Sequence, residues 1–438
     1  MALPFGGRAG ATDLIRYASP EFAIPPGPLS NIGPLVETGV DGILAPRGFG
    51  LRAVGRNLFN PVHGYFDPFS VSGYAWHKAP DGGACFAADD GGWIYVSNCE
   101  SNSSGGAGAL RVSAEGRVTD AYRILDHTRR NCAGGATPWQ TWLSCEEIAD
   151  GQVFECDPFG NAESARALPA LGCFNHEAAA VDLRTRTVFM TEDAHDGRFY
   201  RFLADAEDLS GDGSRLDMNR GRLQVMNIAG YENGRYEERD ATMRGLRSVS
   251  WVDVIEPVRQ QSLVRAELAG MGVRVPGTIF RGGEGVWLHT VLPGLRSVPP
   301  GGRVPSRAFV FFACKTDNRV FGYDIDNGLI ETVFDNASIE LPMSDVDNLV
   351  VSPAGDIIVT EDGEATRLLV ILPNQSAKTL LRAGHKDSEL TGPAFSPDGS
   401  RLYFSSQRGP NLPFRERGTG VTYELSIPPQ YRVARAGI

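Results

Sequence analysis

The chain has 438 residues, with 42 basic and 53 acidic residues and a formal net charge of −11. This acidic balance argues against nucleic acid or an anionic membrane surface as a partner. It does not exclude an anionic substrate, because bound cations can reverse the sign of the local charge. No apolar run reaches the roughly 18 residues of a membrane-spanning helix, so we expect no transmembrane segment.

The N-terminal sequence MALPFGG has no basic stretch followed by an apolar stretch, so no signal peptide is visible. Either the protein is cytoplasmic or an export leader has been removed. Residues 1–40 are expected to form an extended N-terminal arm. The odd number of cysteines, seven, favours reduced thiols over a disulfide framework.

Short β-rich runs alternate with turns rich in Pro, Asp and Gly along most of the chain. Such turns occur at residues 80–82, 89–92, 353–356 and 397–400. Similar strand-like runs at 93–97, 187–191, 356–360 and 401–405 each lead into polar residues. This degenerate repeat predicts an all-β fold, a β-propeller of about six to eight blades, at about 40–50 residues a blade. No linker divides the chain, so residues 1–438 are expected to form a single domain.

The clearest helical pattern lies within residues 251–268, where apolar residues recur at helical spacing before Gly270. Pro257 is expected to start or kink this helix. We therefore predict a helical insertion at residues 240–275 and only short helical insertions elsewhere.

Acidic residues recur where predicted strands end. The clusters are at residues 98–100, 145–147, 176–177, 192–193, 361–362 and 389, with Glu284 as a seventh position. Carboxylates in a strand-rich protein are costly unless they are paired, hydrated or bound to a cation. Equivalent strand ends of a propeller face one channel, so the pattern predicts a centre that holds several metal ions.

Two of these segments contain several kinds of residue that can bind a metal ion. Cys145 beside Glu146 and Glu147 offers a thiolate suited to iron or zinc and carboxylates suited to calcium or magnesium. The alternative is a buried cysteine beside surface glutamates. His176 or Glu177 could bind a metal, but neighbouring residues of a strand point to opposite faces, so only one is expected in the site. The alternative there is a hydrogen-bonded core histidine with an exposed glutamate.

Arg281 lies three residues before Glu284, where a guanidinium could bind a phosphoryl group. The alternative is an arginine in a surface loop.

Together these segments resemble the PhoX-type alkaline phosphatases, also described as proteins of unknown function class 839. The resemblance covers roughly residues 40–425 in the family's order. Its main pieces are YVSNCE (95–100), NCAGG (131–135), TPW (137–139), TWLSCEE (141–147), HEAA (176–179), TED (191–193), YRF (200–202), EG (284–285), DNL (347–349), TGP (391–393) and FSPDG (395–399). Cys99 departs from the family, which often has histidine there.

The resemblance implies a six-bladed propeller whose channel holds two Fe³⁺ ions, two or three Ca²⁺ ions and a bridging oxide. By that resemblance, Cys145, Glu177 and Glu284 hold iron. Calcium or a shared bridge is implied for Glu146, Glu147, Glu192, Glu361 and Glu389. Further candidate ligands are Asn98, Glu100, Asp193, Asp347 and Asp362. Arg281 and Glu284 are the expected catalytic residues, with Arg281 binding the substrate.

The expected function is hydrolysis of small phosphoric esters, as a phosphomonoesterase that could also cleave diesters, by a monomeric protein. By resemblance the protein is periplasmic or secreted. One alternative is a calcium-dependent lactonase or arylesterase propeller, which would not need Cys145 as a ligand. Another is a propeller that binds metal without catalysis, since propellers host many functions.

Overall fold

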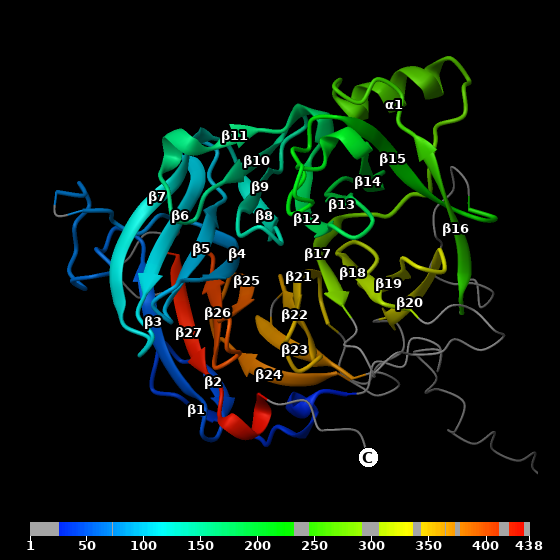
Figure 1. The fold of residues 1–438 in the computed structure, drawn as a ribbon. Coiled ribbons are helices and arrows are strands. Elements are labelled where there is room, and N and C mark those ends of the chain that lie inside the picture. The colour runs from blue at the N-terminus through cyan, green and yellow to red at the C-terminus, as the bar shows by residue number, and fades with distance from the viewer. Residues whose placement is uncertain are drawn as a thin grey trace, which may run out of the picture.

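The computed structural model describes residues 26–71, 73–231, 245–290, 306–335, 343–363, 365–372, 377–410 and 420–432. These residues form five antiparallel sheets arranged in a ring around a central channel (Figure 1). The ring contains six four-stranded blades, because the nine-stranded sheet consists of two blades joined through β16. The predicted all-β propeller is confirmed.

The first three blades follow one another in sequence. Blade 1 contains β4 (Pro80–Ala87), β5 (Trp93–Cys99), β6 (Gly105–Val112) and β7 (Val118–Thr128). Blade 2 contains β8 (Asn131–Ala136), β9 (Trp142–Glu146), β10 (Val153–Cys156) and β11 (Arg166–Ala167). Blade 3 contains β12 (His176–Asp182), β13 (Thr187–Glu192), β14 (Phe199–Ala204) and β15 (Gly221–Ile228), and its edge continues into β16 (Arg247–Asp253).

The last three blades complete the ring. Blade 4 contains β17 (Gly283–Thr290), β18 (Ala308–Cys314), β19 (Arg319–Asp324) and β20 (Leu329–Asp335). Blade 5 contains β21 (Val346–Val351), β22 (Ile357–Glu361), β23 (Arg367–Ile371) and β24 (Lys378–Arg382), extended by β2 (Leu44–Pro46) and β1 (Leu35–Glu37). Blade 6 contains β25 (Leu390–Phe395), β26 (Arg401–Ser406) and β27 (Val421–Ser426), and its fourth strand is β3 (Gly50–Arg56). Pairing of β3 with β27 joins the two ends of the described chain and closes the ring.

Six hydrophobic clusters fill the spaces between neighbouring blades. One example packs Phe86 and Ile94 of blade 1 against Trp142 of blade 2. Another packs Trp93 of blade 1 against Tyr403 of blade 6. The second strand from the channel in each blade is therefore covered on both faces. Every residue of two such strands, β5 and β18, is buried. Burial on both faces explains why these strands are continuous apolar runs rather than alternating ones.

The innermost strands, β4, β8, β12, β17, β21 and β25, contact one another in ring order. We call them the inner strands, and we call β5, β9, β13, β18, β22 and β26, which pair with them, the second strands. The strand-like runs that the sequence repeat identified at 93–97, 187–191, 356–360 and 401–405 are all second strands.

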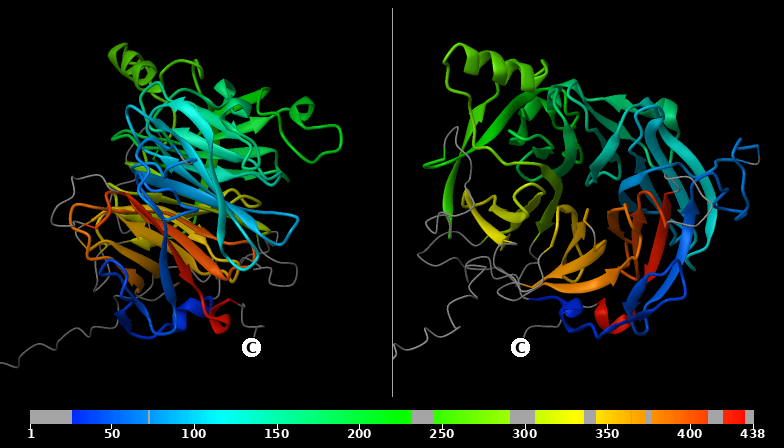
Figure 2. Two further views of the ribbon diagram at one scale, coloured as in Figure 1. Left: turned by 90° about the vertical axis from the view of Figure 1, so that its left-hand side faces the viewer. Right: turned by 180° about the vertical axis from the view of Figure 1, so that it is seen from behind.

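Two sequence predictions about local structure need correction. The proposed helical insertion contains a shorter helix, α1 (Gln261–Gly270), because residues 247–253 form β16 and pair with β15. Pro257 lies in the loop between β16 and α1. This helix lies on the outer rim of the ring (Figure 2). Residues 80–82 form the start of β4 rather than a turn, whereas 89–92, 353–356 and 397–400 do connect strands.

The predicted N-terminal arm is partly outside the described residues, which begin at residue 26. The described part is not simply extended, because it contains the 3₁₀ helix η2 (Pro28–Asn31) and the strand β1. Other 3₁₀ helices are η3 (Ala162–Ser164), η4 (Pro169–Leu171), η5 (Ala206–Asp208) and η8 (Pro429–Tyr431).

Candidate metal centre

Every inner strand has a β-bulge near its first residue. In blade 1, Pro80 lies opposite Cys99 and Gly83 lies opposite Ser97, so three steps on β4 match two steps on β5. The same shift occurs in β8, β12, β17, β21 and β25. A bulge bends the strand and changes the direction of the extra side chain. Six equivalent bulges around one channel therefore direct six sets of side chains to a common region.

The second residue of five inner strands is a carboxylate or a thiol. These residues are Asp81, Cys132, Glu177, Glu284 and Asp347. In the sixth blade, Glu389 immediately precedes β25. The next residue is small where the inner strands approach closely. A Cβ at Gly82 would lie 2.4 Å from the Cα of Ala133, and one at Gly285 would lie 2.5 Å from the backbone nitrogen of Leu349.

A second ring of side chains comes from the residue that directly follows each second strand. Its members are Glu100, Glu147, Asp193, Lys315, Asp362 and Gln407. The two rings lie at the same end of the channel, because the last residue of each second strand pairs with the first residue of its inner strand, as Asn131 pairs with Glu146. We call the two sets together the channel ring.

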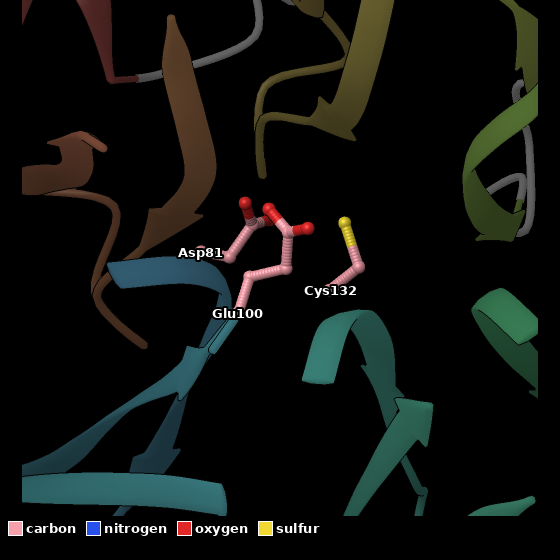
Figure 3. A group of neighbouring side chains, drawn as sticks. All are labelled: Asp81, Glu100 and Cys132. Atoms are coloured by element: carbon pink, nitrogen blue, oxygen red, sulfur yellow. The ribbon is translucent and has the colours of Figure 1, made fainter. Parts of the chain in front are cut away.

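Ligand atoms of nine channel-ring residues form four overlapping groups, and within each group the atoms lie within 4.8 Å of one another. The groups are Asp81–Glu100–Cys132, Cys132–Glu147–Glu177, Glu177–Glu284–Asp347 and Asp347–Asp362–Glu389. Each group shares one residue with the next, so eight carboxylates and one thiol form a continuous array across the channel. In the first group, the side chains of Asp81, Glu100 and Cys132 point toward one another from blades 1 and 2 (Figure 3).

Burial and like charge shift the pKa of these groups upward. Burial, followed by the charges of Glu147 and Asp347, raises the pKa of Glu177 well above its ordinary value. The pKa of Glu284 also rises, first through burial and then through the charges of Asp347 and Glu177. Burial together with Asp81 and Glu177 also raises the pKa of the Cys132 thiol. The array is therefore unfavourable in its ionised form unless cations are present.

Two carboxylate oxygens of the array have no partner among the described residues. Glu177 is 1% exposed and Glu284 is 3% exposed, and one oxygen of each is buried without a hydrogen bond to any described residue. An unpaired polar atom at such depth costs about 1–3 kcal/mol, and more when it is charged. The donor set, oxygens plus one sulfur, and these two orphaned oxygens fit bound metal ions.

Other parts of the channel ring already pair with nitrogen groups. Arg130 bridges Glu100 at 2.8 Å and Glu147 at 2.5 Å, and Arg408 lies 2.9 Å from Glu389. Gln407 donates to Asp81 at 2.8 Å and to Glu100 at 2.6 Å.

Six predicted ligands do not join these groups: Asp193, which belongs to the channel ring, Asn98, and four residues at the ends of second strands. Cys145 packs in the apolar interface between blades 2 and 3. Glu146 accepts the backbone N–H of Arg129 at 2.9 Å. Glu192 pairs with Arg265 at 2.9 Å, and Glu361 pairs with Arg367 at 2.7 Å. All four are the last or penultimate residue of a second strand, whereas the chain turns toward the channel only after the strand ends.

In the segment at residues 98–100, two residues also lie outside the channel ring and one belongs to it. The Asn98 amide donates to the carbonyl oxygens of Cys132 and Ala133 and accepts from Trp142 and Ser144, so it links blades 1 and 2. Cys99 is buried and its Sγ lies 3.2 Å from the carbonyl oxygen of Ser104. Only Glu100 reaches the channel ring.

His176 and Arg281 also lie outside the four groups. His176 stacks on Phe174 with ring centroids 3.6 Å apart, and burial lowers its pKa to about 3, which matches the core histidine of the alternative interpretation. Its neighbour Glu177 is buried in the channel rather than exposed. The Arg281 guanidinium pairs with Asp317 at 3.5 Å.

Sequence reasoning missed five polar residues of this region: Asp81, Cys132, Lys315, Gln407 and Arg130. Asp81 and Cys132 precede strand residues instead of following them, and Asp81 was assigned to a turn. The signal that could have found them is the pattern of the inner strands, in which a ligand residue is followed by Gly or Ala, as in Asp81-Gly82, Cys132-Ala133 and Glu177-Ala178.

A cavity of about 260 Å³ lies along the inner strands and begins at the residues that follow the inner ligands of the channel ring. Most of its lining residues are small or apolar, and they come from all six inner strands, with Gly82, Ala133, Ala178, Gly285 and Gly392 at the bulges and Asn348 as a polar exception. The channel ring therefore lies beside a mostly apolar cavity.

The fold and site define a class, the six-bladed propellers with a ring of acidic ligands at one end of the channel. The family model described as alkaline phosphatase PhoX matches residues 97–153 and 149–294. The chain is therefore similar to the PhoX-type alkaline phosphatases over residues 97–294, and this similarity supports a hydrolase of phosphoric esters.

One solved structure supports the fold, and another is less similar. Pseudomonas fluorescens PhoX, in complex with the transition-state analogue vanadate, has a TM-score of 0.65 and 16% identity, covering 94% of this chain and 98% of that one. A gluconolactonase from Xanthomonas campestris has a TM-score of 0.43 and 11% identity, covering 91% and 98%. No curated protein matches the chain. In the described part of the chain, no helix is long and apolar enough to cross a membrane.

Proposed function

We propose that this protein is a phosphatase that hydrolyses small phosphate monoesters with a mixed iron and calcium centre held by the channel ring. The observation that carries the proposal is the continuous array of eight carboxylates and one thiol, with orphaned oxygens on Glu177 and Glu284 at its middle. Similarity to the PhoX-type alkaline phosphatases over residues 97–294 supports a phosphoric ester as the substrate.

Ligand chemistry divides the array into two kinds of site. A thiolate with carboxylates suits iron, which favours the group Cys132–Glu147–Glu177 and the adjoining Glu284. Groups made only of oxygens suit calcium. The thiolate that the family resemblance assigned to Cys145 is therefore assigned to Cys132, whose Sγ lies within 4.8 Å of carboxylate oxygens of Glu147 and Glu177.

Bound cations would supply Lewis-acid stabilisation of the charge on the phosphoryl oxygens. The chain itself supplies cationic side chains at the same end of the channel. The Arg130 side chain is 36% exposed and already faces two carboxylates, so it can turn toward a phosphoryl group without a change in the backbone. Arg281 remains a candidate for substrate binding, and it would first have to leave Asp317.

The test is elemental analysis of the purified protein beside Glu177→Gln and Glu284→Gln. The proposal predicts iron and calcium in the wild-type protein, and loss of most of the iron together with at least 100-fold lower hydrolysis of p-nitrophenyl phosphate in both variants. Glu163→Gln, a matched change at an exposed helix position, should keep the wild-type metal content and rate. Wild-type metal content in both channel variants would contradict the proposal.

The same preparations decide between monoesters and diesters. We expect a higher kcat/KM for p-nitrophenyl phosphate than for bis-p-nitrophenyl phosphate, because a dianionic monoester gains more from a cationic centre than a monoanionic diester does. A higher value for the diester would contradict the monoester assignment.

A further inference from the structure

Lys315 breaks the chemical pattern of the channel ring. Four of the six residues that follow a second strand are acidic, namely Glu100, Glu147, Asp193 and Asp362, and a fifth is the neutral Gln407. In blade 4 the equivalent position, directly after Cys314, is a lysine. A cationic side chain thus occupies the position where four other blades have a carboxylate.

The ammonium group of Lys315 contacts two carboxylates of one ligand group. Its Nζ is 2.6 Å from a carboxylate oxygen of Asp362 and 3.7 Å from one of Asp347. Both residues belong to the group Asp347–Asp362–Glu389. A lysine side chain is ordinarily cationic at neutral pH, so the two carboxylates have an ammonium group as their partner.

The backbone fixes this position. The Lys315 N–H donates to the carbonyl oxygen of Gly282 at 2.7 Å, and the Lys315 carbonyl accepts the N–H of Asn318 at 3.0 Å. The lysine is therefore held beside the bulge of β17 that directs Glu284 into the channel, and its side chain spans from blade 4 to blade 5.

Geometry and charge leave little reason for a divalent ion in the same group. Calcium binds carboxylate oxygens at about 2.3–2.6 Å, so an ion on Asp362 would lie close to the ammonium that already contacts that carboxylate. Two cations separated by a few ångströms repel strongly where burial weakens screening. Arg408 further neutralises Glu389, at 2.9 Å.

We propose that Lys315 acts as a built-in cation that takes the place of one divalent metal ion at Asp347–Asp362–Glu389. Metal ions are then confined to the groups around Cys132, Glu177 and Glu284. This inference rests on the metal centre of the proposed function, and it lowers the number of calcium ions that the chain binds relative to the number that the family resemblance implies.

The test compares the calcium stoichiometry of the wild-type protein and Lys315→Gln, measured by calorimetric titration and by elemental analysis after gel filtration. Removal of the ammonium should add one bound calcium per chain. Lys315→Arg keeps the charge and should keep the wild-type number. Lys378→Gln, the same chemical change on the outer strand β24, should also keep it. An unchanged calcium number in Lys315→Gln would overturn the inference.

Anomalous diffraction from wild-type crystals soaked in calcium provides a readout that does not depend on any variant folding. No calcium is expected within about 3 Å of the Asp362 and Glu389 carboxylates, and an ion there would overturn the inference. Wild-type protein with ions at Glu177 and Glu284 and also at Asp362 would refute the inference while leaving the proposed function intact. Wild-type protein without ions, beside a Lys315→Gln variant that gains one, would refute the proposed function and support the role of Lys315.

Discussion

Replacing Asp347 by asparagine should stabilise the metal-free protein at alkaline pH. Asp347 is 4% exposed, and its pKa is raised from 3.8 to about 6, first by burial and then by the charges of Asp362, Asp193 and Glu100, against the opposing effect of Lys315. Asparagine carries no charge, and its amide oxygen can still accept the hydrogen bond that Asn348 donates at 2.7 Å.

The magnitude follows from the shift in pKa. At 1.36 kcal/mol per pKa unit, ionised Asp347 costs the folded protein about 3 kcal/mol at pH 8. The folded-state pKa of Asp347 lies above its unfolded value, so the folded wild-type protein is most stable when Asp347 is protonated. This stability is fully present below about pH 3.8 and is lost as the pH rises through about 6. With an unfolding entropy of about 2.1 cal/mol/K per residue over 438 residues, 3 kcal/mol corresponds to about 3 °C in Tm.

The assay is thermal unfolding in excess chelator at pH 4, 6 and 8. Asp347→Asn should melt about 3 °C above the wild-type protein at pH 8, with the difference disappearing toward pH 4. Asp90→Asn, which removes an exposed carboxylate paired with Arg111, should show no such rise. In excess calcium and iron the order should reverse, because the wild-type protein gains binding energy that the variant lacks. A metal-free Asp347→Asn variant that melts at or below the wild-type temperature at pH 8 would refute the reasoning.

Further substitutions separate the channel ring from residues beside it. Cys132→Ser should lose the visible sulfur-to-iron absorption and most of the activity, whereas Cys145→Ala should lose only about 1 kcal/mol of stability; loss of the absorption in Cys145→Ala instead would reassign the thiolate. Arg265→Ala should cost about 3–5 kcal/mol in denaturant unfolding, because Glu192 is left buried and unpaired, with unchanged metal content; release of metal would show that Glu192 belongs to the centre. Arg130→Ala should raise KM for p-nitrophenyl phosphate about tenfold, the loss of one charged hydrogen bond, and unchanged kinetics would exclude Arg130 from substrate binding.

The fold was predictable because its signal repeats. Each second strand is buried on both faces and follows a Pro-Asp-Gly type of turn in several blades, so the same apolar run recurs along the chain. The boundaries of α1 were less predictable, since the apolar residues of β16 continue the helical spacing until strand pairing with β15 removes them from the helix.

The candidate site was predictable only in part, because neighbouring acidic residues in one cluster have different environments. Glu146 and Glu147 are adjacent, yet one accepts backbone N–H groups and the other reaches the channel ring. The choice depends on where the second strand ends and the chain turns. The bulges that direct Asp81 and Cys132 inward depend on close approach of neighbouring inner strands, and that contact is between residues about 50 positions apart, as between Gly82 and Ala133.

The central proposal is a metal centre at the channel ring that hydrolyses phosphoric esters. The most direct measurement is the rate of p-nitrophenyl phosphate hydrolysis before chelation, after removal of all bound metal, and after iron and calcium are restored together. The rate should fall at least 100-fold on metal removal and recover only when both metals are present. Undiminished hydrolysis by protein shown to be free of metal would contradict the proposal.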